Sequence, residues 1–163
     1  MEEDSYIKEG IDSIPFGPVP SRRLGMSLGI NNIPPKICSY SCIYCQVGIT
    51  EQFQSERKVF YRPEDLYRAV EDKIIEIKSR GDRIDYLSFV PDGEPTLDIY
   101  LGREIELLNE TGIPIAVLTN GSLINREDVR RDLSMADWVS LKVDSVTENI
   151  WRRVDRPHRE LKL

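Results

Sequence analysis

The sequence predicts an α/β fold, a partial (β/α) barrel of about four strand–helix units around a parallel sheet. Apolar segments of strand length alternate with segments whose apolar residues recur every three or four positions, and the connections between them are short. A complete TIM-like barrel needs about 250 residues, whereas this chain has 163. We therefore expect an incomplete barrel, truncated at its C-terminal end.

The first strand of this fold is predicted just before the only cysteines. Residues 1–24 should form an extended lead-in, because acidic residues are followed there by several prolines. The core should span residues 25–163 and begin with a strand at 26–30, which asparagines and prolines end. That strand leads directly into the segment KICSYSCIYCQ, residues 36–46.

The clearest helix is predicted between Pro63 and Gly81. Proline in a first helical turn costs no hydrogen bond, acids beside it complement the helix dipole, and glycine is a common stop. One apolar face follows from the spacing of Leu66, Val70, Ile74 and Ile77.

Three more strands, each followed by a helix, complete the pattern. The strands are predicted at 84–90, 114–118 and 138–143. The helices should start at Thr96 as N-cap, after Asn125, and at Ser145, which has Glu148 three residues later as in a capping box.

Parallel strands of such a sheet gather their carboxyl ends at one rim, where ligands bind. The cysteine segment, the GEPT turn (93–96), the TNG turn (119–121) and residues 142–145 all follow predicted strands. We expect these four turns to form one site.

The three cysteines, Cys38, Cys42 and Cys45, are spaced C-x3-C-x2-C. An odd number in one loop is a poor disulfide framework, whereas neighbouring thiolates bind soft metals such as iron or zinc. Structural zinc usually has a fourth Cys or His ligand, and the single histidine, His158, is distant and expected to be packed or on the surface. The pattern favours an iron–sulfur cluster with one iron open.

Charge and apolar content limit the possible partners and location only weakly. The net charge of −6 provides no global field for a polyanion, although a local pair such as Arg22 and Arg23 could contact phosphate or form salt bridges. No stretch approaches the roughly 20 apolar residues that span a bilayer. We expect a cytoplasmic protein without membrane association.

Longer motifs carry a family resemblance from about Phe16 to His158. The segments concerned are GPVPSRRLGMSLGI, CSYSCIYCQVG, DGEPTLD, LTNGSLI and the run from SLKVDS to RRVDRPH. The chain resembles the radical S-adenosylmethionine (SAM) superfamily, in a subgroup of uncharacterised iron–sulfur oxidoreductases related to wyosine (tRNA-modification) synthases. The resemblance implies a barrel of the radical SAM type.

The resemblance also implies a chemistry. Cys38, Cys42 and Cys45 would hold a [4Fe–4S] cluster whose open iron chelates SAM. Reductive cleavage of SAM would give a 5′-deoxyadenosyl radical that abstracts hydrogen from a substrate, for which a tRNA base is one candidate. An external donor similar to flavodoxin or ferredoxin would supply the electron.

Five further residues are implied as cofactor contacts: Tyr44, Gly93, Glu94, Asn120 and Asp144. Gly93 would let the backbone approach a ligand, and Glu94 would accept a hydrogen bond from an ammonium group. The superfamily pattern is Gly-Gly-Glu where this chain has Asp92 before Gly93. Ordinary turn, cap or packing roles remain alternatives for each residue, as do a non-catalytic iron–sulfur protein and a zinc-stabilised binding module for the whole chain.

Overall fold

A five-stranded sheet forms the centre of the computed structural model, which describes residues 6–7 and 10–163. The strands lie in the order β1 (Pro15–Ser21), β2 (Gly25–Ile30), β5 (Tyr86–Phe89), β6 (Ile115–Thr119) and β7 (Trp138–Leu141). The last four are parallel, and β1 is antiparallel to β2. These strands with their connecting helices confirm the predicted partial α/β barrel.

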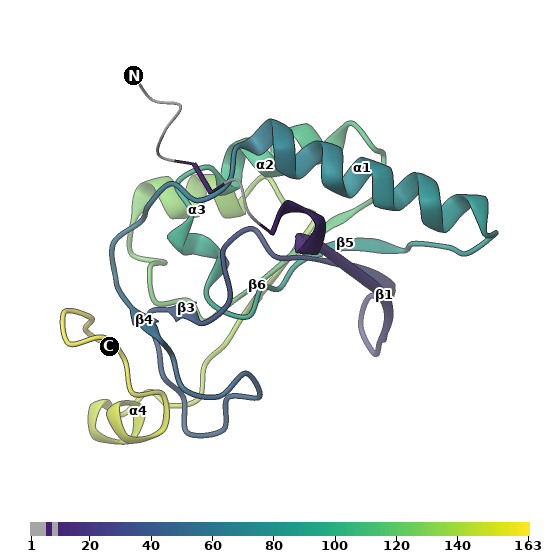
Figure 1. Cartoon of the computed structure of the whole chain (residues 1–163). Coiled ribbons are helices and arrows are strands. Elements are labelled where there is room, and N and C mark those ends of the chain that lie inside the picture. The colour runs from purple at the N-terminus through teal and green to yellow at the C-terminus, as the bar shows by residue number, and fades with distance from the viewer. Residues whose placement is uncertain (1–5, 8–9) are drawn as a thin grey trace.

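The helices connect the parallel strands in chain order. They are α1 (Pro63–Ser79), α2 (Leu101–Asn109), α3 (Glu127–Leu133) and α4 (Glu148–Val154), with short 3-10 helices η2 (Ile11–Ser13) and η3 (Pro95–Leu97). Figure 1 shows α1, α2 and α3 lying together along the sheet, whereas α4 lies apart from them, beyond β3 and β4. Within residues 6–7 and 10–163, no helix combines the length and apolar character needed to cross a bilayer.

The core lies between α1, α2, α3 and the sheet. The predicted apolar face of α1 is buried as expected: Leu66, Val70, Ile74 and Ile77 are each at most 5% exposed. Leu87, Phe89 and Val117 meet these helices from the central strands and are fully buried. Burial of this face holds the helices on the sheet and fixes where each strand ends.

The interpretation of residues 15–20 as an irregular lead-in is wrong, because they form β1. Pro15, Pro18 and Pro20 are tolerated there because β1 is the edge strand, and an edge strand pairs on one side only. The register of β1 against β2 shifts between Phe16 and Val19, which accommodates the proline-rich sequence.

Two predicted helix starts are also wrong. Thr96 lies within η3, and α2 begins later, at Leu101, with Tyr100 as its N-cap. Ser145 precedes α4 without capping it; its hydroxyl accepts a hydrogen bond from the backbone N–H of Thr147, the actual N-cap residue. In both cases the polar side chain stabilises a turn before the helix.

A buried arginine links η3 to α3. The side chain of Arg57 is 4% exposed and donates to the backbone carbonyls of Thr96 (3.0 Å) and Asp98 (2.5 Å). It also forms ion pairs with Asp128 (2.9 Å) and Asp132 (2.6 Å) on α3. Because the Asp132 side chain is itself only 8% exposed, each partner compensates the other's burial.

Replacing Arg57 should therefore destabilise the fold. We expect Arg57→Met to lower the free energy of unfolding in urea by about 3–5 kcal/mol, because the Asp132 carboxylate would remain buried without its partner. Arg126→Met is the control, since Arg126 contacts Asp128 at the surface and should cost no more than about 1 kcal/mol. Equal losses in the two variants would contradict the role given to Arg57.

Two carboxyl groups lie buried near each other, those of Asp98, next to Arg57, and of Glu104 on α2. Neither Oδ2 of Asp98 nor either oxygen of Glu104 makes a hydrogen bond within the described part of the chain. Burial raises the pKa of Asp98 from 3.8 to about 8. Burial and then the charge of Asp98 raise the pKa of Glu104 well above its usual value.

Stability should consequently fall as pH rises. Between about pH 4 and pH 8 the unfolded chain has lost these protons while the folded chain keeps them, so alkalinisation disfavours the fold. Each of the two carboxyl groups lowers the free energy of unfolding by at most about 1.4 kcal/mol per pH unit. In urea titrations at pH 5 to 8, the free energy of unfolding should decline less steeply with pH for Glu104→Gln than for the wild type. The exposed Glu106→Gln on the same helix should leave the decline unchanged, and equal slopes in all three proteins would refute the assignment.

Candidate metal centre

The cysteine loop, residues 36–50, lies at the carboxyl-end rim of the sheet and has little regular structure. Only its start forms a strand, β3 (Ile37–Cys38), which pairs with β4 (Gln52–Phe53). Cys38 and Cys42 are partly buried, and Cys45 is exposed. The loop therefore depends on contacts with other segments for its shape.

The GEPT turn after β5 supports the loop from one side. The backbone N–H of Lys36 donates to the carbonyl of Asp92 (2.6 Å), and that of Glu94 donates to the carbonyl of Ile37 (3.1 Å). A Cβ at Gly93 would lie 2.1 Å from the Ile37 carbonyl oxygen. Gly93 thus allows close approach to the loop backbone just before Cys38, and its expected approach to a ligand stays a prediction.

Glu94 acts as a positioning residue between two turns of the rim, and the expected contact of its carboxylate with a ligand stays a prediction. The residue is 1% exposed. One carboxylate oxygen accepts from the N–H and hydroxyl of Thr96 (3.1 and 2.5 Å) and from the hydroxyl of Thr119 (2.5 Å). The other accepts from the N–H of Asn120 (2.7 Å). Glu94 therefore ties the end of β5 to the end of β6.

Asn120, held by that bond, reaches the first cysteine. Its side-chain amide donates to the hydroxyl of Ser39 at 2.9 Å and lies 3.7 Å from Sγ of Cys38. The backbone N–H of Tyr40 also donates to this sulfur at 3.4 Å. Hydrogen-bond donors around a sulfur stabilise the thiolate form that a metal binds.

A charged cluster after β7 surrounds the second cysteine. The ammonium of Lys142 lies 3.1 Å from Sγ of Cys42, 2.5 Å from Asp155 and 2.8 Å from Asp144. The hydroxyl of Tyr44 donates to Asp144, so these two predicted residues meet. Burial alone would lower the pKa of Lys142, but its hydrogen bonds to Asp144 and Asp155 outweigh burial and raise it.

Burial is the main influence on the pKa values of the two partly buried thiols, Cys38 and Cys42. It raises the pKa of Cys38 to about 12, against the opposing hydrogen bond from Tyr40. Burial also raises the pKa of Cys42, with Lys142 opposing the rise. Both thiols are neutral near pH 7 in the metal-free chain, and metal binding would release their protons.

The segment 154–158 supports the loop from the other side. The N–H of Ile43 donates to the carbonyl of Val154 (2.9 Å), and the N–H of His158 donates to the carbonyl of Ser39 (2.8 Å). His158 is packed edge-on against Phe53 with ring centroids 5.1 Å apart. The sequence-based expectation of a packing role for this histidine is consistent with that contact.

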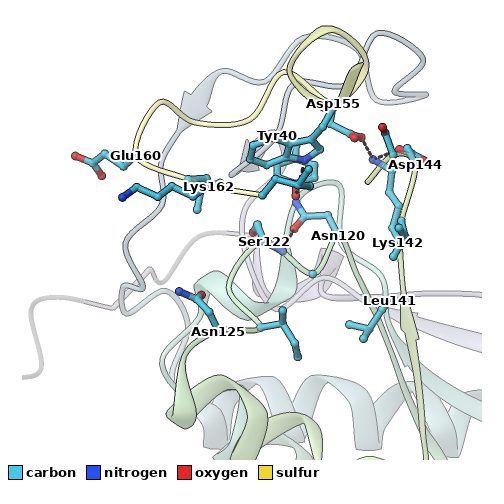
Figure 2. Close-up of a pocket in the computed structure, with 17 residues that line it drawn as sticks. Tyr40, Asn120, Ser122, Asn125, Leu141, Lys142, Asp144, Asp155, Glu160 and Lys162 are labelled. Atoms are coloured by element: carbon cyan, nitrogen blue, oxygen red, sulfur yellow. Dashed lines mark hydrogen bonds and ion pairs between the residues drawn. The ribbon is translucent and has the colours of Figure 1, made fainter. Parts of the chain in front are cut away.

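A cavity of about 510 Å³ opens beside the loop. Figure 2 shows Asn120, Lys142, Asp144 and Asp155 gathered on one side of it, below α4. Its lining comes from the TNG turn, the segment after β7, α4 and the last residues of the chain. Among residues 6–7 and 10–163, no three His, Cys, Asp or Glu side chains are placed to share a single metal ion.

Sequence reasoning assigned no role to Lys142 or Asp155. Lys142 lies in the segment 142–145 that was expected at the rim, and Asp155 lies in RRVDRPH, where the family resemblance was its signal. Asp155 meets Cys42 across 113 positions of the chain. No local pattern identifies a contact over such a separation.

The fold and the site define a class: an α/β partial barrel that presents three cysteines on a loop at its strand-end rim. A family model described as the Radical SAM superfamily matches residues 32–161. The chain belongs to this superfamily, whose members use a [4Fe–4S] cluster and SAM. The sequence resemblance to the radical SAM superfamily is confirmed, and its wyosine-related branch stays a prediction.

Individual proteins show the same relationship. The chain is 60% identical over 151 residues to UPF0026 protein MJ1312 of Methanocaldococcus jannaschii, covering 93% of this chain and 46% of that protein. It is 29% identical over 111 residues to an S-adenosylmethionine-dependent nucleotide dehydratase of a Thermoplasmatales archaeon, covering 68% and 36%. The chain thus spans less than half the length of these two relatives.

A solved structure shares the fold. The structure of TYW1 with a lysine-pyruvate adduct bound superposes with a TM-score of 0.61 at 21% identity, over 82% of this chain and 47% of that one. This likeness supports the partial-barrel architecture and carries no assignment of individual residues.

The close packing at Gly93 yields a prediction. Gly93→Ala would place a methyl group against the Ile37 carbonyl, so we expect the apparent Tm to fall and the iron bound after anaerobic reconstitution to decrease. Gly48→Ala is the matched control within the cysteine loop, because a Cβ there meets no atom within 4 Å and only its φ of 90° opposes the change. Equal iron content in Gly93→Ala and wild type would contradict the proposed support of the loop.

Proposed function

We propose that this chain supplies the cluster-binding part of a radical SAM enzyme, with Cys38, Cys42 and Cys45 as the ligands of a [4Fe–4S] cluster. The observation that carries the proposal is the cysteine loop at the strand-end rim, bonded to the GEPT turn on one side and to residues 154–158 on the other. Three thiols without a fourth cysteine match a cluster with one open iron.

The residues around the thiols fit such a group. Cys38 has N–H groups of Tyr40 and Asn120 directed at its sulfur, and Cys42 has the ammonium of Lys142 beside it. These donors would compensate the negative charge that three thiolates bring to a partly buried site. The exposed Cys45 leaves room for the cluster to enter the loop.

SAM would occupy the side of the cysteine loop that faces the cavity. When bound, the cluster supplies the electron that cleaves SAM to methionine and a 5′-deoxyadenosyl radical, which takes hydrogen from the substrate. Asn120 and Asp144 line the cavity, and Tyr44 is held beside it by Asp144. These three side chains are proposed SAM contacts, as are Gly93 and Glu94, which also keep the rim in shape.

A nucleotide or a nucleic acid base is the substrate class that the relatives favour. A 29%-identical relative is described as a nucleotide dehydratase, and the resemblance to wyosine synthases suggests a tRNA base. An external one-electron donor such as a flavodoxin or ferredoxin completes the proposed reaction. Residues 1–24 and 25–163 stay our proposed division of the chain, with β1 belonging structurally to the sheet of the second part.

The ligand assignment has a direct test. Cys42→Ala, purified without oxygen and reconstituted with iron and sulfide, should lose most of the charge-transfer absorbance of the cluster and at least about 90% of 5′-deoxyadenosine release with dithionite and SAM. Cys42→Ser serves as the conservative comparison. Unchanged cluster content in Cys42→Ala would disprove the assignment.

The same preparation separates the alternatives. A cluster that is reduced by dithionite without release of 5′-deoxyadenosine would indicate a non-catalytic iron–sulfur protein. Stoichiometric zinc without iron or sulfide would indicate a zinc-stabilised module.

A further inference from the structure

Four arginines gather on the outer side of the cysteine loop. Arg152 and Arg153 lie on α4, and Arg156 and Arg159 follow it; all four are exposed. We call them the arginine face. The side chains of Arg153, Arg156 and Arg159 make no ion pair or hydrogen bond with any residue that the structure describes. The face therefore presents unpaired positive charge on a chain whose net charge is −6.

Nearby acids do little to neutralise this charge. Asp155 is 1% exposed and pairs inward with Lys142. Glu148 pairs with Arg152, and Glu160 is engaged by Ser55 and His158. The outer side of the loop is thus positive while the rest of the chain is acidic.

Two shallow hollows mark the face, and they share Arg152 and Arg156. The first is lined by Ile43, Ile150, Arg152, Arg153, Val154 and Arg156, and the second by Ser41, Thr50, Phe53, Arg152, Arg156, Pro157 and Arg159. Neither shares a lining residue with the cavity that contains Asn120 and Asp144. The cysteine loop can therefore be approached from two separate directions.

The backbone connects this face to the cysteines. The N–H of Ser41 donates to the carbonyls of Asp155 and Arg156, both at 3.1 Å, and the N–H of Ile43 donates to Val154. Ile43 follows Cys42 directly and is 57% exposed in the first hollow. A partner seated on the arginine face would therefore contact the loop that carries all three thiols.

We propose that the arginine face docks a small acidic redox protein that delivers one electron to the cluster. This inference rests on the proposed function. The donor is oxidised by one electron and the cluster is reduced by one, and no bond or proton is exchanged. Positive charge would steer an acidic partner to the loop, and electron-transfer complexes of this kind are small and transient.

The composition of the face favours a protein over a nucleic acid. Exposed Ile43 and Ile150 lie among the arginines, and an apolar centre with arginine around it is typical of protein interfaces. Phe53, the aromatic side chain in the second hollow, packs against His158. That contact leaves Phe53 42% exposed, so the comparison with a labelled tRNA below tests the nucleic acid alternative directly.

The test uses a flavodoxin as the probe and measures binding directly. We expect Arg153→Glu with Arg159→Glu to raise the Kd for the flavodoxin at least about tenfold at low ionic strength, and wild-type binding to weaken with added salt. The control, Arg22→Glu with Arg23→Glu, makes the same charge change in the β1–β2 turn, at the end of β2 away from the cysteine loop. Its Kd should stay within about twofold of wild type. Arg156 is left in place because its φ of 46° makes substitution there a separate perturbation.

A kinetic measurement separates this inference from the proposed function. In the face variant, reduction of the cluster by flavodoxin hydroquinone should slow while reduction by dithionite is unchanged. Wild-type flavodoxin affinity in the face variant would overturn the docking proposal. So would loss of binding to a labelled tRNA in that variant with flavodoxin binding intact, because the face would then recognise nucleic acid. Absence of 5′-deoxyadenosine release with dithionite in the wild type would refute the proposed function instead.

Discussion

The site depends first on the buried carboxylate of Glu94. It accepts four hydrogen bonds, from Thr96, Thr119 and Asn120, and so joins the ends of two adjacent strands. A buried carboxylate is tolerated only when such donors replace its hydration. Because these bonds fix Asn120, its amide reaches Cys38, and the glycine before Glu94 lets the turn lie against the loop backbone. Loss of the carboxylate would free the turn, the end of β6 and the first cysteine together.

The fold was predictable where local periodicity and burial agree. The spacing of Leu66, Val70, Ile74 and Ile77 predicted α1, and the apolar runs predicted four parallel strands, because both patterns follow from which side chains are buried. The errors arose where long-range pairing overrides local preference. Prolines in 15–20 indicate irregular chain, but pairing with β2 on one side makes an edge strand of it. Thr96 and Ser145 have the chemistry of N-caps, yet the chain enters each helix only later.

The sequence predicted which residues lie at the candidate site better than it predicted what each of them contacts. All eight predicted residues lie around the cysteine loop because parallel strands bring their ends to one rim. What each side chain contacts depends on partners far away in the chain, as with Tyr44 and Asp144, 100 positions apart. Gly93 and Glu94 contact other protein groups here, and their contacts with a cofactor stay predictions. The ion pair of Lys142 with Asp155 was found only in three dimensions.

Under the proposed function, the two sides of the cysteine loop would have different roles in the reductive cleavage of SAM. On the inner side, Asn120 and Asp144 line a cavity of about 510 Å³, a volume in the range of small-molecule sites. On the outer side, the arginine face is open, and Arg153, Arg156 and Arg159 have no ion-pair partner among the residues that the structure describes, whereas Arg152 pairs with Glu148. The same α4 region separates them, since buried Trp151 and Asp155 face the cavity while Ile150 and Arg153 face outward. Under the proposed function, an electron would enter from outside without passing through the space where radical chemistry must be kept from solvent.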